Sequence, residues 1–110
     1  MDDATQLHAD QIAYWNGPGG AQWAAQQRQT DAMLAPVAEA TIEHAAPKAG
    51  ELALDIGCGC GSATLMLARE VGAAGHVTGL DVSAPMLDVA KERARRVANV
   101  DWVAADAAAF

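Results

Sequence analysis

The chain has 110 residues, of which 52% are hydrophobic and only 5% aromatic, and its formal net charge is −7. This length suits one small domain, or part of a larger one, with a core of modest stability. The acidic balance repels phosphate backbones and argues against a nucleic-acid partner, and no run approaches the roughly twenty apolar residues of a membrane span.

The first part of the chain is predicted to be helical. Residues 4–46 are rich in Ala and Gln and contain no β-branched cluster. The Gly-Pro-Gly-Gly run at 17–20 should separate a first helix, ending near Trp15, from later helices that begin near Ala21 and Asp31.

Two prolines mark the rest of this segment. Pro36 lies inside the last helical stretch, so that helix should either start late or be kinked. Residues 47–50 (Pro-Lys-Ala-Gly) are typical of a linker, and the pattern changes after them. We therefore divide the chain into a helical segment, residues 1–49, and a second segment, residues 50–110.

The second segment alternates between strand and helix. Residues 52–56 form a short apolar run, as expected for a strand that is covered on both faces, and residues 76–81 and 100–104 are the next two strands. The helix between the first two strands should end at Gly72.

The helix after the second strand has a clear start. Ser83 is a good N-cap, and Pro85 is tolerated in the first turn. We expect this helix to run towards Ala98, with Glu92 and Arg96 paired four residues apart on its exposed side. The residues expected on its buried side are Leu87, Ala90, Ala94 and Val97.

This alternation predicts an α/β fold with a parallel, right-handed β-α-β-α-β sheet. A ligand of such a sheet sits outside the carboxyl ends of the strands, where strand order reverses. Residues 55–61, 81–82 and 106–107 all fall at such ends. These three segments are therefore the candidate site.

The most informative motif is Asp-Ile-Gly-Cys-Gly-Cys-Gly at residues 55–61. Glycines at alternate positions let the backbone bend sharply and let a ligand approach it closely. Asp81 ends the second strand, and its carboxylate can accept hydrogen bonds from two neighbouring ribose hydroxyls. Together these features indicate a nucleoside-containing cofactor.

The two cysteines lie within this motif. Cys58 and Cys60 are too close in sequence to form a disulfide readily, and neither a second pair nor a nearby histidine completes a zinc site. Unbridged thiols favour a reducing compartment, and the first residues show no charged-then-apolar leader. We expect a cytoplasmic protein without a metal site.

A dinucleotide and S-adenosylmethionine make different demands on this motif. A dinucleotide requires G-x-G-x-x-G/A, and the two possible frames place Ser62 or Thr64 at the last position. S-adenosylmethionine has no pyrophosphate, but its ammonium group needs acceptors, and Asp55 is placed to supply a negative charge. The motif therefore favours S-adenosylmethionine.

In these motifs the chain resembles the class I S-adenosylmethionine-dependent methyltransferases. The resemblance lies in residues 54–61, residues 79–83, Met86 and residues 106–107. It implies a Rossmann-like three-layer sandwich, of which this chain would contain the first β-α-β-α-β half of a mostly parallel sheet, preceded by the N-terminal helices.

The resemblance also implies a role for each matching residue. The acid before the loop and the glycine loop itself would hold the methionine part: Asp55, Gly57, Cys58, Gly59 and Gly61. Asp81 would bind the ribose hydroxyls and Asp106 the adenine amino group. The apolar contacts with the adenine ring would be Val82, Met86 and Ala107.

Residues 14–46 are similar to the helical N-terminal part of small-molecule members near the ubiquinone and menaquinone biosynthesis group. In those members the helices form a cap or lid over the cofactor. Tyr14, Trp15 and Trp23 would then either touch the sulfonium through their aromatic faces or serve in ordinary packing. His8, His44 and His76 are dispersed, and the sequence identifies no catalytic base.

The implied activity is transfer of a methyl group to a small-molecule acceptor. Two alternatives remain: a non-catalytic cofactor-binding fragment or scaffold, and an NAD(P)-dependent oxidoreductase. Complete members of the family have further strands, so we expect this chain to be the N-terminal portion of a truncated domain. The first strand would then have a bare apolar edge, and such edges pair with another chain, which predicts a homo-oligomer.

Overall fold

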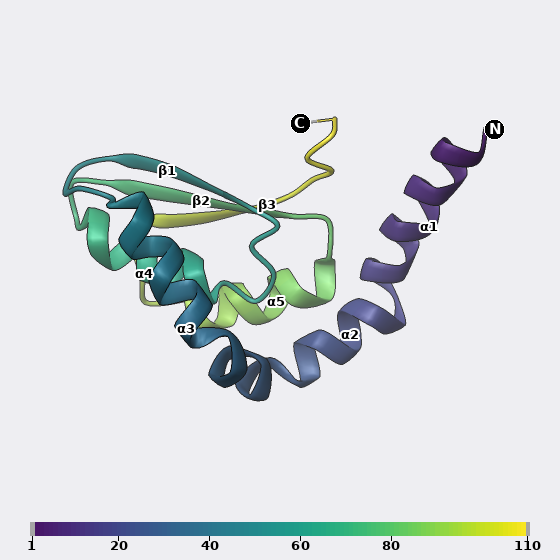
Figure 1. Ribbon diagram of the computed structural model, residues 1–110, viewed down its shortest axis with the longest axis horizontal. Helices are drawn as coiled ribbons and strands as arrows, with labels where there is room; N and C mark the ends of the chain where they lie inside the picture. The colour runs from purple at the N-terminus through teal and green to yellow at the C-terminus, as the bar shows by residue number, and fades with distance from the viewer. Residues whose placement is uncertain (1, 110) are drawn as a thin grey trace.

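The computed structural model describes residues 2–109, and within them the predicted alternation of strands and helices is present (Figure 1). Three helices precede the sheet: α1 (Asp3–Asn16), α2 (Pro18–Ala25) and α3 (Gln27–Ala45). The remaining elements are β1 (Leu52–Ile56), α4 (Ser62–Val71), β2 (His76–Asp81), α5 (Ala84–Arg93) and β3 (Val100–Ala104). All three strands have the predicted bounds.

The strands form one parallel sheet in the order β1-β2-β3. In the register of this sheet, Leu54 lies beside Thr78 and Thr78 beside Asp101. Two right-handed crossovers that step in the same direction place their helices on the same face. Figure 1 shows α3, α4 and α5 on that one face.

Residues 2–109 form the first part of the expected Rossmann-like sheet, which gives the sheet two features. The described part contains the sheet and one helix layer, which is a portion of the expected three-layer arrangement. The strand order contains no reversal within residues 2–109, and the carboxyl ends of the three strands lie along one edge of this sheet.

The core lies between the sheet and α4. Ala68, Val71 and Val77 are buried there, and the partly buried apolar residues packed against them are Ala53, Leu67, Val97 and Val100. The opposite face of β1 is open, since Leu52 is 83% and Ile56 62% exposed. The expectation that this strand is covered on both faces is wrong for the described residues, because nothing packs against its outer side chains.

The N-terminal helices begin earlier than the sequence suggested. The second one starts at Pro18 rather than near Ala21, because proline has the φ angle of a first helical turn. The third starts at Gln27 rather than near Asp31 and continues through Pro36, so it does not start late. No helix in residues 2–109 combines the length and hydropathy needed to cross a membrane.

The cap of α5 is as predicted, but its end is not. The Ser83 hydroxyl accepts a hydrogen bond from the Met86 amide at 3.4 Å. The helix ends at Arg93 instead of running towards Ala98, and the chain then turns into β3. Because of this turn Glu92 pairs with Arg95 at 2.8 Å, and the expected pair with Arg96 is not made.

The next loop is held by Asn99, whose amide donates to the carbonyls of Ala68 and Gly72. Gly72 ends α4 as predicted, with φ +67°. Asn99 therefore fixes the entry to β3 against the end of α4.

We predict that Gly61→Ala lowers the free energy of unfolding by about 1–3 kcal/mol more than Gly50→Ala does. Both glycines have φ +87°, where an L side chain is strained, so both alanines carry a backbone cost. Only at Gly61 would a Cβ meet a side chain, because Cη2 of Trp102 lies 2.6 Å from its position, whereas Gly50 has nothing within 4 Å. Urea unfolding followed by circular dichroism measures the difference, and equal losses would contradict this packing.

Candidate functional site

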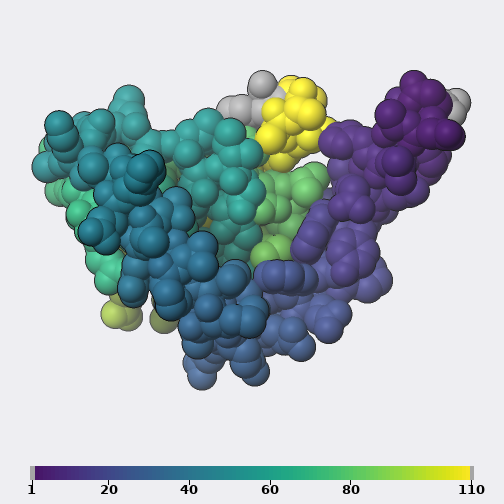
Figure 2. Space-filling view, in the orientation of Figure 1, coloured from purple at the N-terminus to yellow at the C-terminus, as the bar shows by residue number. Residues whose placement is uncertain are grey.

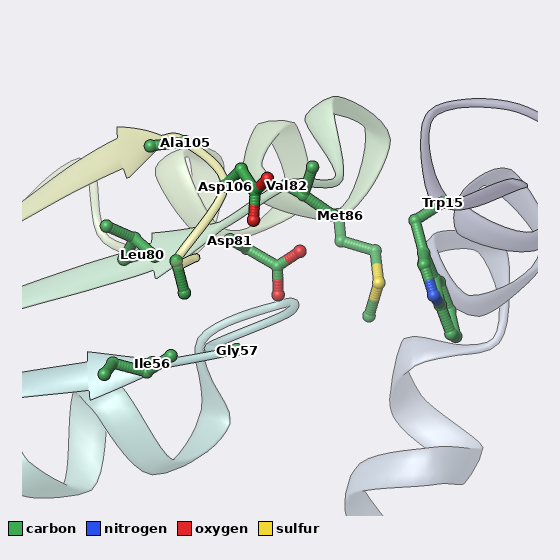
Figure 3. Close-up of a pocket in the computed structure, with 10 residues that line it drawn as sticks. Trp15, Ile56, Gly57, Leu80, Asp81, Val82, Met86, Ala105 and Asp106 are labelled. Atoms are coloured by element: carbon green, nitrogen blue, oxygen red, sulfur yellow. The ribbon is translucent and has the colours of Figure 1, made fainter. Parts of the chain in front are cut away.

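A cavity of about 390 Å³ opens at the carboxyl ends of the three strands. Backbone hydrogen bonds hold these ends together, since the Gly57 amide donates to the main-chain carbonyl of Leu80 and the Ala105 amide donates to the main-chain carbonyl of Asp81. Figure 3 shows Asp81 and Met86 reaching into the space between the strand ends and Trp15. The lining residues are Trp15, Ile56, Gly57, Leu80, Asp81, Val82, Met86, Ala105, Asp106 and Ala107.

Asp81 is the central polar group of this cavity. One carboxylate oxygen accepts the Gly59 amide at 2.8 Å, and the other accepts the Ser83 amide at 2.8 Å. Each oxygen of an ionised carboxylate has a second lone pair that can accept another donor. Asp81 can therefore hold the two loops together and still bind two hydroxyl groups of a ligand.

The glycine loop has the sharp bend that the sequence predicts. Gly57, Gly59 and Gly61 all have positive φ, at +74°, +55° and +87°. A Cβ on Gly57 would meet nothing within 4 Å, whereas one on Gly59 would lie 2.9 Å from Cε of Met86. Gly57 therefore presents open backbone to the cavity, while Gly59 and Gly61 shape the loop and do not line it.

Asp55 also lies outside the cavity lining. Its carboxylate accepts a hydrogen bond from the Thr64 hydroxyl at 2.7 Å, on the side of α4. Burial raises the pKa of Asp55, the Thr64 hydrogen bond lowers it, and the charge of Asp81 raises it again. In this structure Asp55 braces the first turn of α4. Sequence reasoning missed Thr64, although its place in that first turn could have indicated it.

The two cysteines are free thiols at the base of the loop. Burial, with the nearby charges of Asp81 and Asp55, raises the pKa of Cys58 to about 12. Burial likewise raises the pKa of Cys60. Both side chains are therefore protonated at neutral pH, and a thiol in that state is a poor nucleophile and a poor metal ligand. Among residues 2–109 no group of three His, Cys, Asp or Glu side chains is arranged to hold a metal ion.

Asp106 lines the cavity and is bound to the first helix. Its carboxylate contacts Nε2 of His8 at 2.5 Å and accepts the Ala108 amide at 3.0 Å. In Figure 2 the purple N-terminal helix and the yellow segment after β3 lie next to each other. Sequence reasoning missed this role of His8, because no local pattern relates residues 98 positions apart.

The aromatic residues of the N-terminal helices divide into two groups. Trp15 lines the cavity, whereas Tyr14 and Trp23 do not. Trp15 packs edge-to-face against both, with ring centroids 5.1 Å from Tyr14 and 6.1 Å from Trp23. Of the three aromatic residues considered for contact with a ligand, the structure thus brings only Trp15 to the cavity.

We predict that His8→Ala raises the pKa of Asp106 towards its ordinary value. The hydrogen bond from His8, with that from the Ala108 amide, holds this pKa low. A lowered pKa in the folded state stabilises the fold above the ordinary pKa of aspartate, and this contribution disappears as the pH falls through the lowered value. Carbon-13 NMR titration of the Asp106 carboxyl measures the shift.

The control for this titration is His44→Ala, because His44 is exposed on α3 and makes no contact with Asp106. It should leave the Asp106 titration unchanged. An Asp106 pKa that is the same in wild type and His8→Ala would show that the pair does not form in solution.

Comparison with known proteins identifies the family of this chain. The family model described as "Methyltransferase domain" matches residues 53–110. The 2-phytyl-1,4-naphtoquinone methyltransferase of Nostoc punctiforme is 44% identical over 71 residues, which cover 62% of this chain and 31% of that protein. The demethylmenaquinone methyltransferase of Staphylococcus haemolyticus is 47% identical over 60 residues, covering 54% of this chain and 25% of that protein.

Among solved structures, a SAM-dependent methyltransferase from Aquifex aeolicus superposes with a TM-score of 0.57 at 28% identity, covering 63% of this chain and 38% of that one. The fold is thus the Rossmann-like fold of this group. The chain spans between a quarter and a third of the length of the two curated relatives. Because the family model matches more than half of its residues, the chain belongs to the class I S-adenosylmethionine-dependent methyltransferases, near the members of quinone biosynthesis.

Proposed function

We propose that this chain is the cofactor-binding part of a methyltransferase that uses S-adenosylmethionine to methylate a small molecule. The observation that carries the proposal is the cavity at the strand ends, where Asp81, Asp106 and the open backbone of Gly57 meet. In this proposal residues 50–110 form the first half of the cofactor-binding domain, and residues 1–49 form a cap over it.

The chemistry of the cavity fits an adenosyl group. Asp81 supplies two carboxylate oxygens with spare lone pairs, which suit a pair of ribose hydroxyls. Asp106 has one contact on each oxygen and can still accept a hydrogen bond from the adenine amine. The side chains of Val82, Met86 and Ala107 complete apolar walls for the ring.

The methionine part is assigned differently from the sequence-based expectation. Gly57 has open backbone at the cavity and would touch this part directly. The remaining residues would act through the shape of the loop, since none of them lines the cavity: Asp55, Cys58, Gly59 and Gly61. This division is supported by the contact of Asp55 with Thr64 on α4.

Bound S-adenosylmethionine supplies a methyl group activated by a positively charged sulfur. In such a transfer the protein binds and orients the cofactor and the acceptor and excludes water. Trp15 presents an aromatic ring to the cavity, and such a ring attracts a nearby cation. No residue of the described part is assigned as a catalytic base.

The acceptor is proposed to be a quinone-type small molecule, because both relatives above are named for such acceptors. The acidic net charge of −7 supports the absence of a nucleic-acid partner. Free thiols at Cys58 and Cys60 support a cytoplasmic location.

We predict that Asp81→Ala weakens binding of S-adenosylhomocysteine at least tenfold, since the variant loses both ribose acceptors and the tie between the two loops. Calorimetry on the 110-residue chain measures the dissociation constant. Asp88→Ala is the matched control, because this carboxylate is exposed on α5 and lies outside the cavity. Unchanged affinity in Asp81→Ala would reject the assigned role.

The melting temperature of the same purified chain distinguishes a methyltransferase from an NAD(P)-dependent oxidoreductase. Only a ligand that binds the folded state raises the melting temperature. S-adenosylhomocysteine should raise it, and NAD should not. The reverse result would favour a dinucleotide site.

We further propose that β1 mediates self-association. Within residues 2–109 this strand pairs with β2 alone, and its outer side chains are exposed. Open apolar edges of this kind pair with another chain. Sedimentation should show a dimer or larger assembly at high concentration, and Leu54→Lys should dissociate it. Met33→Lys is the control, because Met33 is 69% exposed but lies on α3. A wild-type monomer at every concentration would contradict the proposal.

A further inference from the structure

The end of α1 is bound to the turn between β2 and α5 by the side chain of Asn16. Its amide nitrogen donates to the Val82 carbonyl at 2.8 Å and to the Ile12 carbonyl at 3.0 Å. Its amide oxygen accepts the Ala84 amide at 3.0 Å. The Asn16 side chain therefore forms hydrogen bonds with the backbone on both sides of Ser83.

Ser83 makes the reciprocal contact. It is fully buried, and its hydroxyl donates to the Trp15 carbonyl at 2.6 Å. A Cβ on Gly20 would lie 1.8 Å from that carbonyl oxygen and 2.5 Å from the Ser83 hydroxyl. The backbones of α1, α2 and the turn therefore meet at one point, beside the Trp15 side chain.

The same turn forms part of the cavity wall. Val82 and Met86 line it, and the Ser83 amide is one of the two donors that hold Asp81. Trp15 stands opposite Met86 across the opening, as Figure 3 shows. The contacts of Asn16 therefore connect two walls of the cavity that come from distant parts of the chain.

We propose that Asn16 is a positioning residue for the cavity: it fixes Trp15 relative to the turn 82–84, so that docking of the N-terminal helices and binding of an adenosyl ligand strengthen each other. Asn16 is not a lining residue and acts through Trp15. This inference rests on the proposed function, and linkage makes the coupling reciprocal.

The test measures S-adenosylhomocysteine binding to the full chain by calorimetry. Loss of about two hydrogen bonds predicts roughly tenfold weaker binding in Asn16→Ala. Asn16→Asp retains the acceptor for Ala84 but loses the donor to Val82. Its affinity should therefore lie between that of wild type and that of Asn16→Ala. Gln11→Ala, an exposed change on the same helix, should bind like wild type.

Two readouts separate positioning from general stability. In a Trp15→Ala background, Asn16→Ala should change the affinity less than about twofold, because the effect passes through Trp15. In protein labelled with 5-fluorotryptophan, Asn16→Ala should shift the Trp15 fluorine resonance, assigned with Trp15→Phe, and leave that of Trp102 in place.

Wild-type affinity in Asn16→Ala would overturn the positioning role alone, and so would an equal loss of affinity in both backgrounds. Failure of the wild-type chain to bind S-adenosylhomocysteine would instead overturn the proposed function, and this inference with it. The two failures are therefore distinguishable.

Discussion

The carboxylate of Asp81 accepts one amide hydrogen bond from Gly59 and one from Ser83, and so joins the glycine loop to the turn that starts α5. A glycine loop alone is a flexible segment, because residues without a Cβ have many accessible conformations. The hydrogen bond from Gly59 to Asp81 ties this loop to the end of the second strand, and so fixes the shape of one side of the cavity. The same carboxylate lines the cavity and keeps lone pairs that can accept further hydrogen bonds, so one side chain provides both a structural constraint and a binding group.

The parallel sheet decides which residues can meet at this cavity. All three strands point the same way, so the positions that follow them gather at one edge even though they are far apart in sequence. Gly57, Asp81 and Asp106 come together for this reason. The same topology sends α4 and α5 to one face of the sheet and leaves the apolar side chains of β1 uncovered on the other.

The N-terminal helices add features that the family match does not contain. The match covers residues 53–110, whereas Trp15 and His8 come from α1. Trp15 forms a wall of the cavity, and His8 contacts Asp106 at its rim. The helix thus takes part in the site at two points, His8 near its middle and Trp15 near its C-terminal end. Differences between related enzymes in this segment would therefore alter the site without any change in the glycine motif.

The sequence by itself determined the three strands, the cap at Ser83, the sharp bend of the glycine loop and the family, because each depends on neighbouring residues or a fixed spacing. Only the tertiary structure decided the direction of Asp55 towards Thr64, the end of α5 at Arg93, and the contact of Asp106 with His8. These depend on which segments pack side by side, and residues 98 positions apart carry no local pattern that relates them.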